Sequence, residues 1–281
     1  MQRALKSVTI TPAKLSIELY RAHAGFAVFT SIVTLEAGEG LRIYTVSSTP
    51  LLKIPLLASN AVFIVIGSTS PNPPPKPSEL SKYGRQDSIS RGNFNALLHI
   101  IKSVAVITAV AEIAVILAQE YPSLSGHISL LPLSPSSGVR VTNTFVASGT
   151  LISMGGLIRW WCYRTLGRFF TYELSVKEEH QLVTVGPYSI VRHPSYTGGI
   201  MQTIGVVLWS LDPGSWWSNL GRFSVTARNI CVVLWLSFWI IFAVSGVSRL
   251  SKEDRILKKE FGDQWEKWSR ITPYKLIPFV Y

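Results

Sequence analysis

The sequence has few charged residues and almost no cysteine for its length. Only 15% of its 281 residues are charged, against 47% that are hydrophobic, whereas a soluble domain usually carries about 25% charged residues. The only two cysteines, Cys162 and Cys231, lie in separate hydrophobic stretches, which excludes a disulfide framework and a CxxC metal site. So few charges cannot coat a globule of this size. The chain is therefore predicted to be a membrane protein with several spans.

Motifs for nucleic-acid binding and for secretion are also missing. The formal net charge of +11 would indicate a nucleic-acid partner in a soluble protein, but no zinc-finger spacing, aromatic RNA-binding strand or long basic helix accompanies it. In a membrane protein, Lys and Arg collect in cytosolic loops, so we expect no nucleic-acid partner. The N-terminus lacks the charged, apolar and small-residue regions of a cleaved signal peptide.

Hydrophobic stretches predict an all-α fold class, a polytopic transmembrane helix bundle. A bilayer takes about 20 helical residues. The four clearest stretches of this length are Ala96 to Ala118, Asn143 to Cys162, Tyr196 to Asp212 and Asn229 to Ser248. A fifth stretch, Leu51 to Ser70, is predicted to begin its helix near Pro55, and a sixth, Ala22 to Leu35, is short and polar at its edges. Five or six spans are therefore expected.

The distribution of basic residues predicts the orientation of these spans. Residues 71–95 combine a proline-rich run with four basic residues, and the tail from Arg249 onward carries eight. Both segments, together with residues 163–195, are expected on the cytosolic side. We expect two parts: residues 1–95, with N-terminal membrane segments and a cytosolic linker, and residues 96–281, the membrane core with a cytosolic site.

Three ionisable residues fall inside predicted spans. Charge inside a membrane is costly and often functional. Lys102 and Arg159 lie within two turns of a helix end, so snorkelling to the interface is the simpler explanation and function is the alternative. Glu112 lies near the opposite end of its span, and both interpretations stay open for it.

Two clusters of polar and aromatic residues flank the last two spans. The first, Leu182 to Gly199, reads LVTVGPYSIVRHPSYTGG. The second follows the last span, where Arg249 and Glu253 share a helix face. The second cluster also contains an apolar stripe at three-to-four spacing, which predicts an amphipathic helix on the cytosolic membrane surface. The stripe consists of Leu257, Phe261, Trp265 and Trp268. Interfacial aromatics and an exposed ion pair account for single pieces of these clusters, but the density of the first favours a functional site.

Together the two clusters closely resemble the isoprenylcysteine carboxyl methyltransferase family. More broadly, they resemble the membrane methyltransferases that include phospholipid N-methyltransferases. Two motifs, one span apart, carry the resemblance: Leu182 to Gly199 and Arg249-x-x-x-Glu253-Asp254-x-x-Leu257-x-x-x-Phe261-Gly262. The resemblance covers about residues 140–281. Asp254 stands where the family usually has a second Glu, so it receives no role, and Trp265 and Trp268 replace two tyrosines.

The resemblance implies a binding site for S-adenosylmethionine and a catalytic pair, without a metal. Arg249 and Glu253 form the pair, with Arg249 on the substrate. The implied cofactor contacts are His180, Gln181, Leu182, Val183, Tyr188, His193, Pro194, Ser195, Tyr196 and Glu253.

The reaction implied by the resemblance is methyl esterification of the α-carboxylate of a C-terminal prenylated cysteine. The substrates would be prenylated CaaX proteins met in the lipid of the endoplasmic reticulum membrane, with the site facing the cytosol. An α-carboxyl has a pKa of about 3.3–3.7 and is ionised at pH 7, so no general base is needed. The alternatives are a phospholipid N-methyltransferase, a sterol-reductase-like enzyme using a nicotinamide cofactor, and a non-catalytic membrane protein, including an inactive family member.

Overall fold

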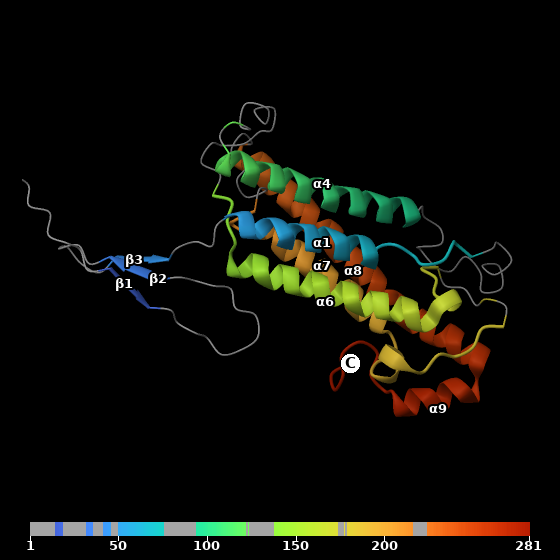
Figure 1. Cartoon of the computed structure of the whole chain (residues 1–281). Coiled ribbons are helices and arrows are strands. Elements are labelled where there is room, and N and C mark those ends of the chain that lie inside the picture. The colour runs from blue at the N-terminus through green and yellow to red at the C-terminus, as the bar shows by residue number, and fades with distance from the viewer. Residues whose placement is uncertain are drawn as a thin grey trace, which may run out of the picture.

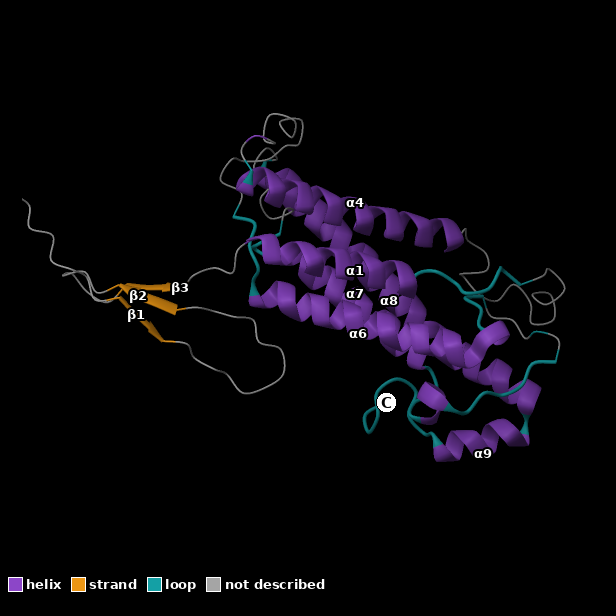
Figure 2. Cartoon of the chain, in the orientation of Figure 1, coloured by secondary structure: helices purple, strands orange, loops and turns teal. Residues whose placement is uncertain are grey.

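The computed structural model describes residues 50–75, 94–121, 123, 138–173, 177, 179–215 and 224–281, and the backbone of 15–18, 32–35 and 42–45. From residue 50 onward every regular element that it describes is helical (Figure 2). The α-helices are α1 (Lys53–Gly67), α4 (Phe94–Glu120), α6 (Asn143–Leu166), α7 (Pro194–Leu211), α8 (Val225–Phe261) and α9 (Asp263–Ile271). Short 3-10 turns are η1 (Pro50–Leu52), η2 (Gly167–Phe169) and η3 (Gly186–Ser189).

Three short strands precede the helices. β1 (Leu15–Glu18), β2 (Ile32–Leu35) and β3 (Arg42–Thr45) form an antiparallel sheet in that order, with Leu15 opposite Leu35 and Ile32 opposite Thr45. The β-branched residues of β2 favour a strand. The prediction of a helix over Ala22 to Leu35 is therefore wrong at its C-terminal end, and residues 22–31 lie outside the described residues. The all-α prediction is correct for the described residues from 50 onward.

The bundle consists of helices that lie alongside one another, namely α1, α4, α6, α7 and α8 (Figure 1). The C-terminal ends of α1 and α6, the N-terminal ends of α4 and α7, and the second half of α8 share one end, called here the motif end. α6 and α7 approach each other closely where Gly155 faces Gly198. A β-carbon on Gly198 would lie 2.7 Å from the Gly155 carbonyl oxygen, so only glycine permits this contact.

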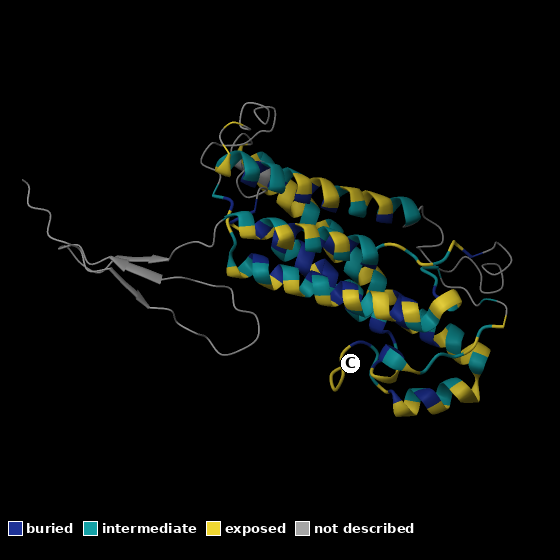
Figure 3. Cartoon of the chain, viewed as in Figure 1, coloured by how far each residue is buried: buried dark blue, intermediate teal, exposed yellow. Residues whose placement is uncertain are grey.

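Three of the described helical segments are long and apolar enough to cross a membrane. They are Pro50–Gly67, Asn95–Glu120 and Asn229–Phe261. Only 6% of the apolar window in α8 is buried inside the protein, and exposed residues also run along α4 (Figure 3). Such faces would be unfavourable in water and suit contact with lipid. α6 and α7 form at the predicted places, but whether they cross, and so the total of five or six spans, stays a prediction.

The C-terminal segment differs from the predicted surface helix. α8 ends at Phe261, and the chain turns at Gly262, whose φ of +48° suits glycine. α9 then places Trp268 inward, 5% exposed, with its indole N–H donating to the Tyr188 carbonyl at 3.1 Å. The predicted apolar stripe is therefore split between two helices, and Trp268 packs against the protein instead of the membrane.

A buried ion cluster joins the helices at the other end of the bundle. Lys53 Nζ lies 2.5 Å from Glu112 Oε1 and 3.6 Å from Asp212 Oδ2, and all three side chains are 0% exposed. Lys53 also donates to the Gly214 carbonyl at 2.7 Å, and Thr142 donates to Asp212. The cluster links α1, α4, α6 and the loop after α7. Glu112 is thus an ion-pair partner inside the bundle.

Candidate functional site

The main cavity lies at the motif end and has a volume of about 550 Å³, within the usual range of ligand sites. Its polar end is lined by side chains from α6, α7, α8 and the segment that precedes α7. The remainder is an apolar arm between α1, α4, α7 and α8. Ile64, Leu98, Ile101, Val206, Trp239 and Phe242 line this arm.

The motif that precedes α7 owes its shape to two special residues and to the C-terminal tail. Gly186 has a φ of +61° at the start of η3, which favours glycine, and Pro194 occupies the first turn of α7. The backbone N–H groups of Arg192 and His193 donate to the carbonyls of Tyr274 and Lys275, each at 2.9 Å. The tail after α9 thus holds the motif in place.

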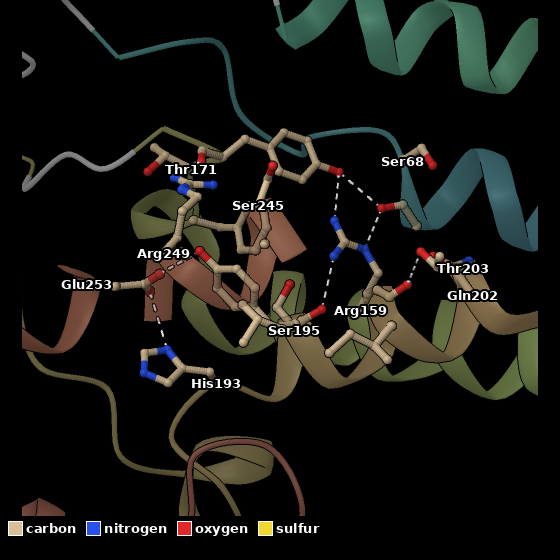
Figure 4. Close-up of a pocket in the computed structure, with 18 of the residues that line it drawn as sticks. Ser68, Arg159, Thr171, His193, Ser195, Gln202, Thr203, Ser245, Arg249 and Glu253 are labelled. Carbon is tan, nitrogen blue, oxygen red and sulfur yellow. Dashed lines mark hydrogen bonds and ion pairs between the residues drawn. The ribbon is translucent and has the colours of Figure 1, made fainter. Parts of the chain in front are cut away.

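A chain of charged side chains connects this motif to α8. The Tyr196 hydroxyl donates to Glu253 Oε2 at 2.8 Å, and His193 Nδ1 lies 3.7 Å from Glu253 Oε1 (Figure 4). On its other side, His193 Nε2 lies 2.9 Å from Asp254 Oδ1. Arg192 completes the chain at 3.4 Å from Asp254 Oδ2. Glu253 therefore faces the cavity, whereas Asp254 does not line it and contacts Arg192 and His193 of the motif.

This arrangement fixes the charge of His193 near neutral pH. Burial alone would lower the pKa of His193, but the hydrogen bonds and negative charges of Asp254 and Glu253 raise it to about 9. The imidazolium is thus present at pH 7 and is lost as the pH rises through about 9.

Arg249 and Arg159 approach the cavity from opposite helices and meet at Tyr172. Arg249, 6% exposed, donates through Nη2 to the Tyr172 carbonyl at 2.7 Å. Arg159 donates through Nη2 to the Tyr172 hydroxyl at 3.1 Å and through Nη1 to the Ser195 carbonyl at 3.0 Å. Its Nε also donates to the Gly67 carbonyl at 2.5 Å. Arg159 therefore forms part of the cavity wall, and its interpretation as a snorkelling side chain is wrong.

His180 closes the polar end beside aromatic rings. Its ring stacks on Phe169 with centroids 4.7 Å apart and meets the edge of Phe261 at 5.6 Å. Burial and the charge of Lys177 lower the pKa of His180, so it is neutral at pH 7. Its buried Nδ1 has no hydrogen-bond partner within the described part of the chain, as expected of an atom that a ligand would satisfy.

The structure brings together most of the residues that the motifs indicated. Gln181 is exposed and Pro194 is buried in the helix start, and neither lines the cavity. Two other residues also line it: Arg159, for which snorkelling was the simpler prediction, and Tyr172, which no motif indicated. The predicted residues that line it are His180, Leu182, Val183, Tyr188, His193, Ser195, Tyr196, Arg249 and Glu253.

The apolar arm ends at a ring made of one side chain from each of four helices: Ile64, Ile101, Val206 and Trp239. A second, smaller cavity of about 30 Å³ lies beyond the ring. Trp239 is 5% exposed and is the largest member of the ring. Ten residues separate it from Arg249 along α8, a rise of about 15 Å. Among the described residues, no three His, Cys, Asp or Glu side chains gather closely enough to hold a metal ion.

Comparison with known proteins points to one family. The model of the isoprenylcysteine carboxyl methyltransferase family matches residues 148–259. Protein-S-isoprenylcysteine O-methyltransferase B of Arabidopsis thaliana is 31% identical over 133 residues, which are 47% of this chain and 57% of that protein. The protein-S-isoprenylcysteine O-methyltransferase of Schizosaccharomyces pombe is 31% identical over 116 residues, 40% of this chain and 41% of its own. The resemblance carried by the motifs is confirmed over residues 148–259.

A second group of relatives consists of sterol reductases. The Delta(14)-sterol reductase of Neurospora crassa is 27% identical over 128 residues, 41% of this chain and 26% of that protein. The chain thus spans little more than half the length of the plant methyltransferase, and about a quarter of the sterol reductase.

Proposed function

We propose that this chain is an S-adenosylmethionine-dependent methyltransferase that esterifies the α-carboxylate of a C-terminal prenylated cysteine. One observation carries the proposal: the motif before α7 and the Arg249–Glu253 pair of α8 line a single cavity that continues into an apolar arm. A polar end beside an apolar arm suits a substrate with a carboxylate at one end and a hydrocarbon chain at the other.

The polar end has groups that fit S-adenosylmethionine. When bound, this cofactor supplies an activated methyl group next to a positively charged sulfur. Glu253, 30% exposed at the cavity wall, offers a carboxylate to the positively charged amino group of the cofactor or to its ribose hydroxyls. His180 offers its unsatisfied Nδ1 and an aromatic surface shared with Phe169. Tyr188 and Tyr196 also line the cavity.

Arg249 is the residue that we assign to the carboxylate of the substrate. Its planar guanidinium can hold a carboxylate through two parallel hydrogen bonds, and its contact with the Tyr172 carbonyl fixes its direction. Because the carboxylate is already ionised at pH 7, the protein need not remove a proton. Alignment of two reactants can lower a barrier by roughly 7–11 kcal/mol, and a dry cavity removes the water that would shield the carboxylate.

The apolar arm would hold the prenyl chain. Ile241 and Val247 line the cavity and yet are exposed on α8, so the cavity reaches the face of the helix that we expect to meet lipid. A chain dissolved in the membrane can enter there, while the cofactor arrives from the cytosol. By the distribution of basic residues the motif end faces the cytosol, and location in the endoplasmic reticulum membrane is part of the proposal.

The test is the methylation of a farnesylcysteine analogue by the purified protein with labelled S-adenosylmethionine. Arg249→Ala and Glu253→Ala should each abolish the transfer while the protein still inserts into membranes. Arg255→Ala and Glu260→Ala are matched controls, because both residues are exposed on the same helix, and they should keep wild-type activity. Full activity in both site variants would refute the assignment.

The sterol-reductase-like alternative predicts a different ligand for the same cavity. A sterol reductase is among the relatives of this chain. Purified protein should bind S-adenosylhomocysteine and not a nicotinamide dinucleotide, and the reverse result would favour the reductase.

A further inference from the structure

Asp254 is buried next to the site without reaching the cavity. It is 8% exposed and is absent from the cavity lining. Its two oxygens are directed to the motif, with Oδ1 2.9 Å from His193 Nε2 and Oδ2 3.4 Å from Arg192 Nη2. Its neighbour Glu253 points the opposite way, toward the cavity. Two consecutive acidic residues thus have two different surroundings.

The imidazole of His193 lies between these two carboxylates. Nε2 faces Asp254 at 2.9 Å and Nδ1 faces Glu253 at 3.7 Å. An ionised carboxylate can only accept hydrogen bonds, and a neutral imidazole has only one N–H. Both contacts are therefore favourable only when both ring nitrogens carry a proton, so the geometry selects the imidazolium.

The charged groups around His193 are balanced. Arg192 and His193 carry positive charge, Glu253 and Asp254 carry negative charge, and the ring of Tyr196 meets His193 edge-on with centroids 5.8 Å apart. From the C-terminal tail, the backbone carbonyl of Lys275 accepts the His193 N–H. If Asp254 lost its charge, His193 would keep Glu253 alone as a nearby anion.

The cation matters because Glu253 borders an apolar cavity. Burial in such surroundings disfavours a charged carboxylate, and a nearby positive charge favours it. The imidazolium, the Tyr196 hydroxyl at 2.8 Å and the positive charge of Arg249 all favour the Glu253 carboxylate in its observed place. The position of the Glu253 carboxylate therefore depends in part on the charge of His193, and that charge depends on Asp254.

We infer that Asp254 is a positioning residue that keeps His193 as a cation, and that this cation holds the Glu253 carboxylate directed at the positive groups of the methyl donor. The inference rests on the proposed function, since it supposes a cationic cofactor in the cavity. It separates the roles of the two acids: Glu253 meets the cofactor, and Asp254 acts on it only through His193.

The test is the affinity of the full-length protein for S-adenosylhomocysteine, measured by calorimetry between pH 6 and pH 8.5. Wild type should bind almost equally across this range. In Asp254→Asn the pKa of His193 should fall from about 9 toward the ordinary 6.5, so affinity should drop about tenfold or more at pH 8.5 and recover at pH 6. Asp254→Glu should restore the wild-type profile, and the exposed Asp263→Asn should leave it unchanged.

A purely structural role for Asp254 gives a different result. Asp254→Asn would then weaken binding by the same factor at every pH, or leave it unchanged at every pH, and either profile would overturn the inference. NMR titration of the His193 ring in both proteins gives a second measurement, because the inference requires its pKa to fall in the variant. If wild type fails to bind S-adenosylhomocysteine at any pH, the proposed function is refuted and the inference is refuted with it.

Discussion

Replacing Lys53 by Met tests how the bundle is held together far from the site. Methionine has a similar length and no charge, so the substitution leaves Glu112 and Asp212 in a buried site without their shared cation. Lys53 Nζ lies 2.5 Å from Glu112 and 3.6 Å from Asp212, and none of the three side chains is exposed. The variant also loses the hydrogen bond to the Gly214 carbonyl and the contact of Nζ with the Phe145 ring at 4.4 Å.

The expected loss is about 3–5 kcal/mol of stability. This is the usual effect of removing one partner from a buried ion pair, because the other charge is left without compensation. At roughly 2–4 °C per kcal/mol for a protein of this size, the midpoint of thermal unfolding should fall by about 10 °C. The assay is the fraction of protein that stays monodisperse after heating in detergent.

A matched control separates the buried charge from the general effect of a Lys-to-Met change. Lys102 lies on α4 and its Nζ makes an exposed hydrogen bond to Thr69 Oγ1 at 3.3 Å, so Lys102→Met should change stability by no more than about 0.5 kcal/mol. Adding Glu112→Gln to Lys53→Met should recover part of the loss, because it removes one stranded charge. If Lys53→Met unfolds at the same temperature as the control variant and wild type, the cluster does not stabilise the bundle.

Three further predictions concern the cavity and its walls. Arg159→Met should lower methylation at least tenfold, because its donors hold the Ser195 carbonyl and Tyr172, and a variant with unchanged kcat/KM would contradict this role. Trp239→Ala should join the two cavities, so the ratio of kcat/KM for geranylgeranyl over farnesyl substrates should rise; an unchanged ratio would mean that the chain does not reach the ring. Gly198→Leu should cost about 1–3 kcal/mol by overpacking against Gly155, seen as a lower melting temperature, whereas the wild-type value would contradict the close contact.

The helices of the bundle could be predicted because hydrophobic length alone determines them. The stretch Ala96 to Ala118 becomes α4 (Phe94–Glu120), and Asn143 to Cys162 becomes α6 (Asn143–Leu166). The stretch Ala22 to Leu35 was harder, since it is short and rich in β-branched residues at its end. The turn at Gly262 had a visible signal, because glycine commonly ends a helix, but the aromatic spacing across it favoured one continuous helix.

The site could be predicted where its residues are close in sequence, and not where packing assembles it. The motif before α7 indicated His193 and Tyr196, and the α8 motif indicated Glu253. Arg159 and Tyr172 gave no comparable signal, because their contacts with Gly67 and Ser195 bridge segments up to 105 residues apart. An arginine near a helix end is equally consistent with snorkelling until its partners are known.

The buried ion cluster is another feature that the sequence alone could not predict. Lys53 and Glu112 lie on different helices, and Asp212 lies in the loop after a third. Each is explained singly by a position near the end of a span. Only the packing of α1 against α4 and α7 brings the three charges together, and a single sequence does not reveal that packing.

The most direct test of the account is a methyl-transfer assay with labelled S-adenosylmethionine against two acceptors, a farnesylated peptide with a free C-terminal carboxylate and phosphatidylethanolamine. Label is expected in the peptide, as a base-labile methyl ester, and not in the lipid. Label in the lipid alone, or no transfer to either acceptor by protein that is folded and inserted, would contradict it.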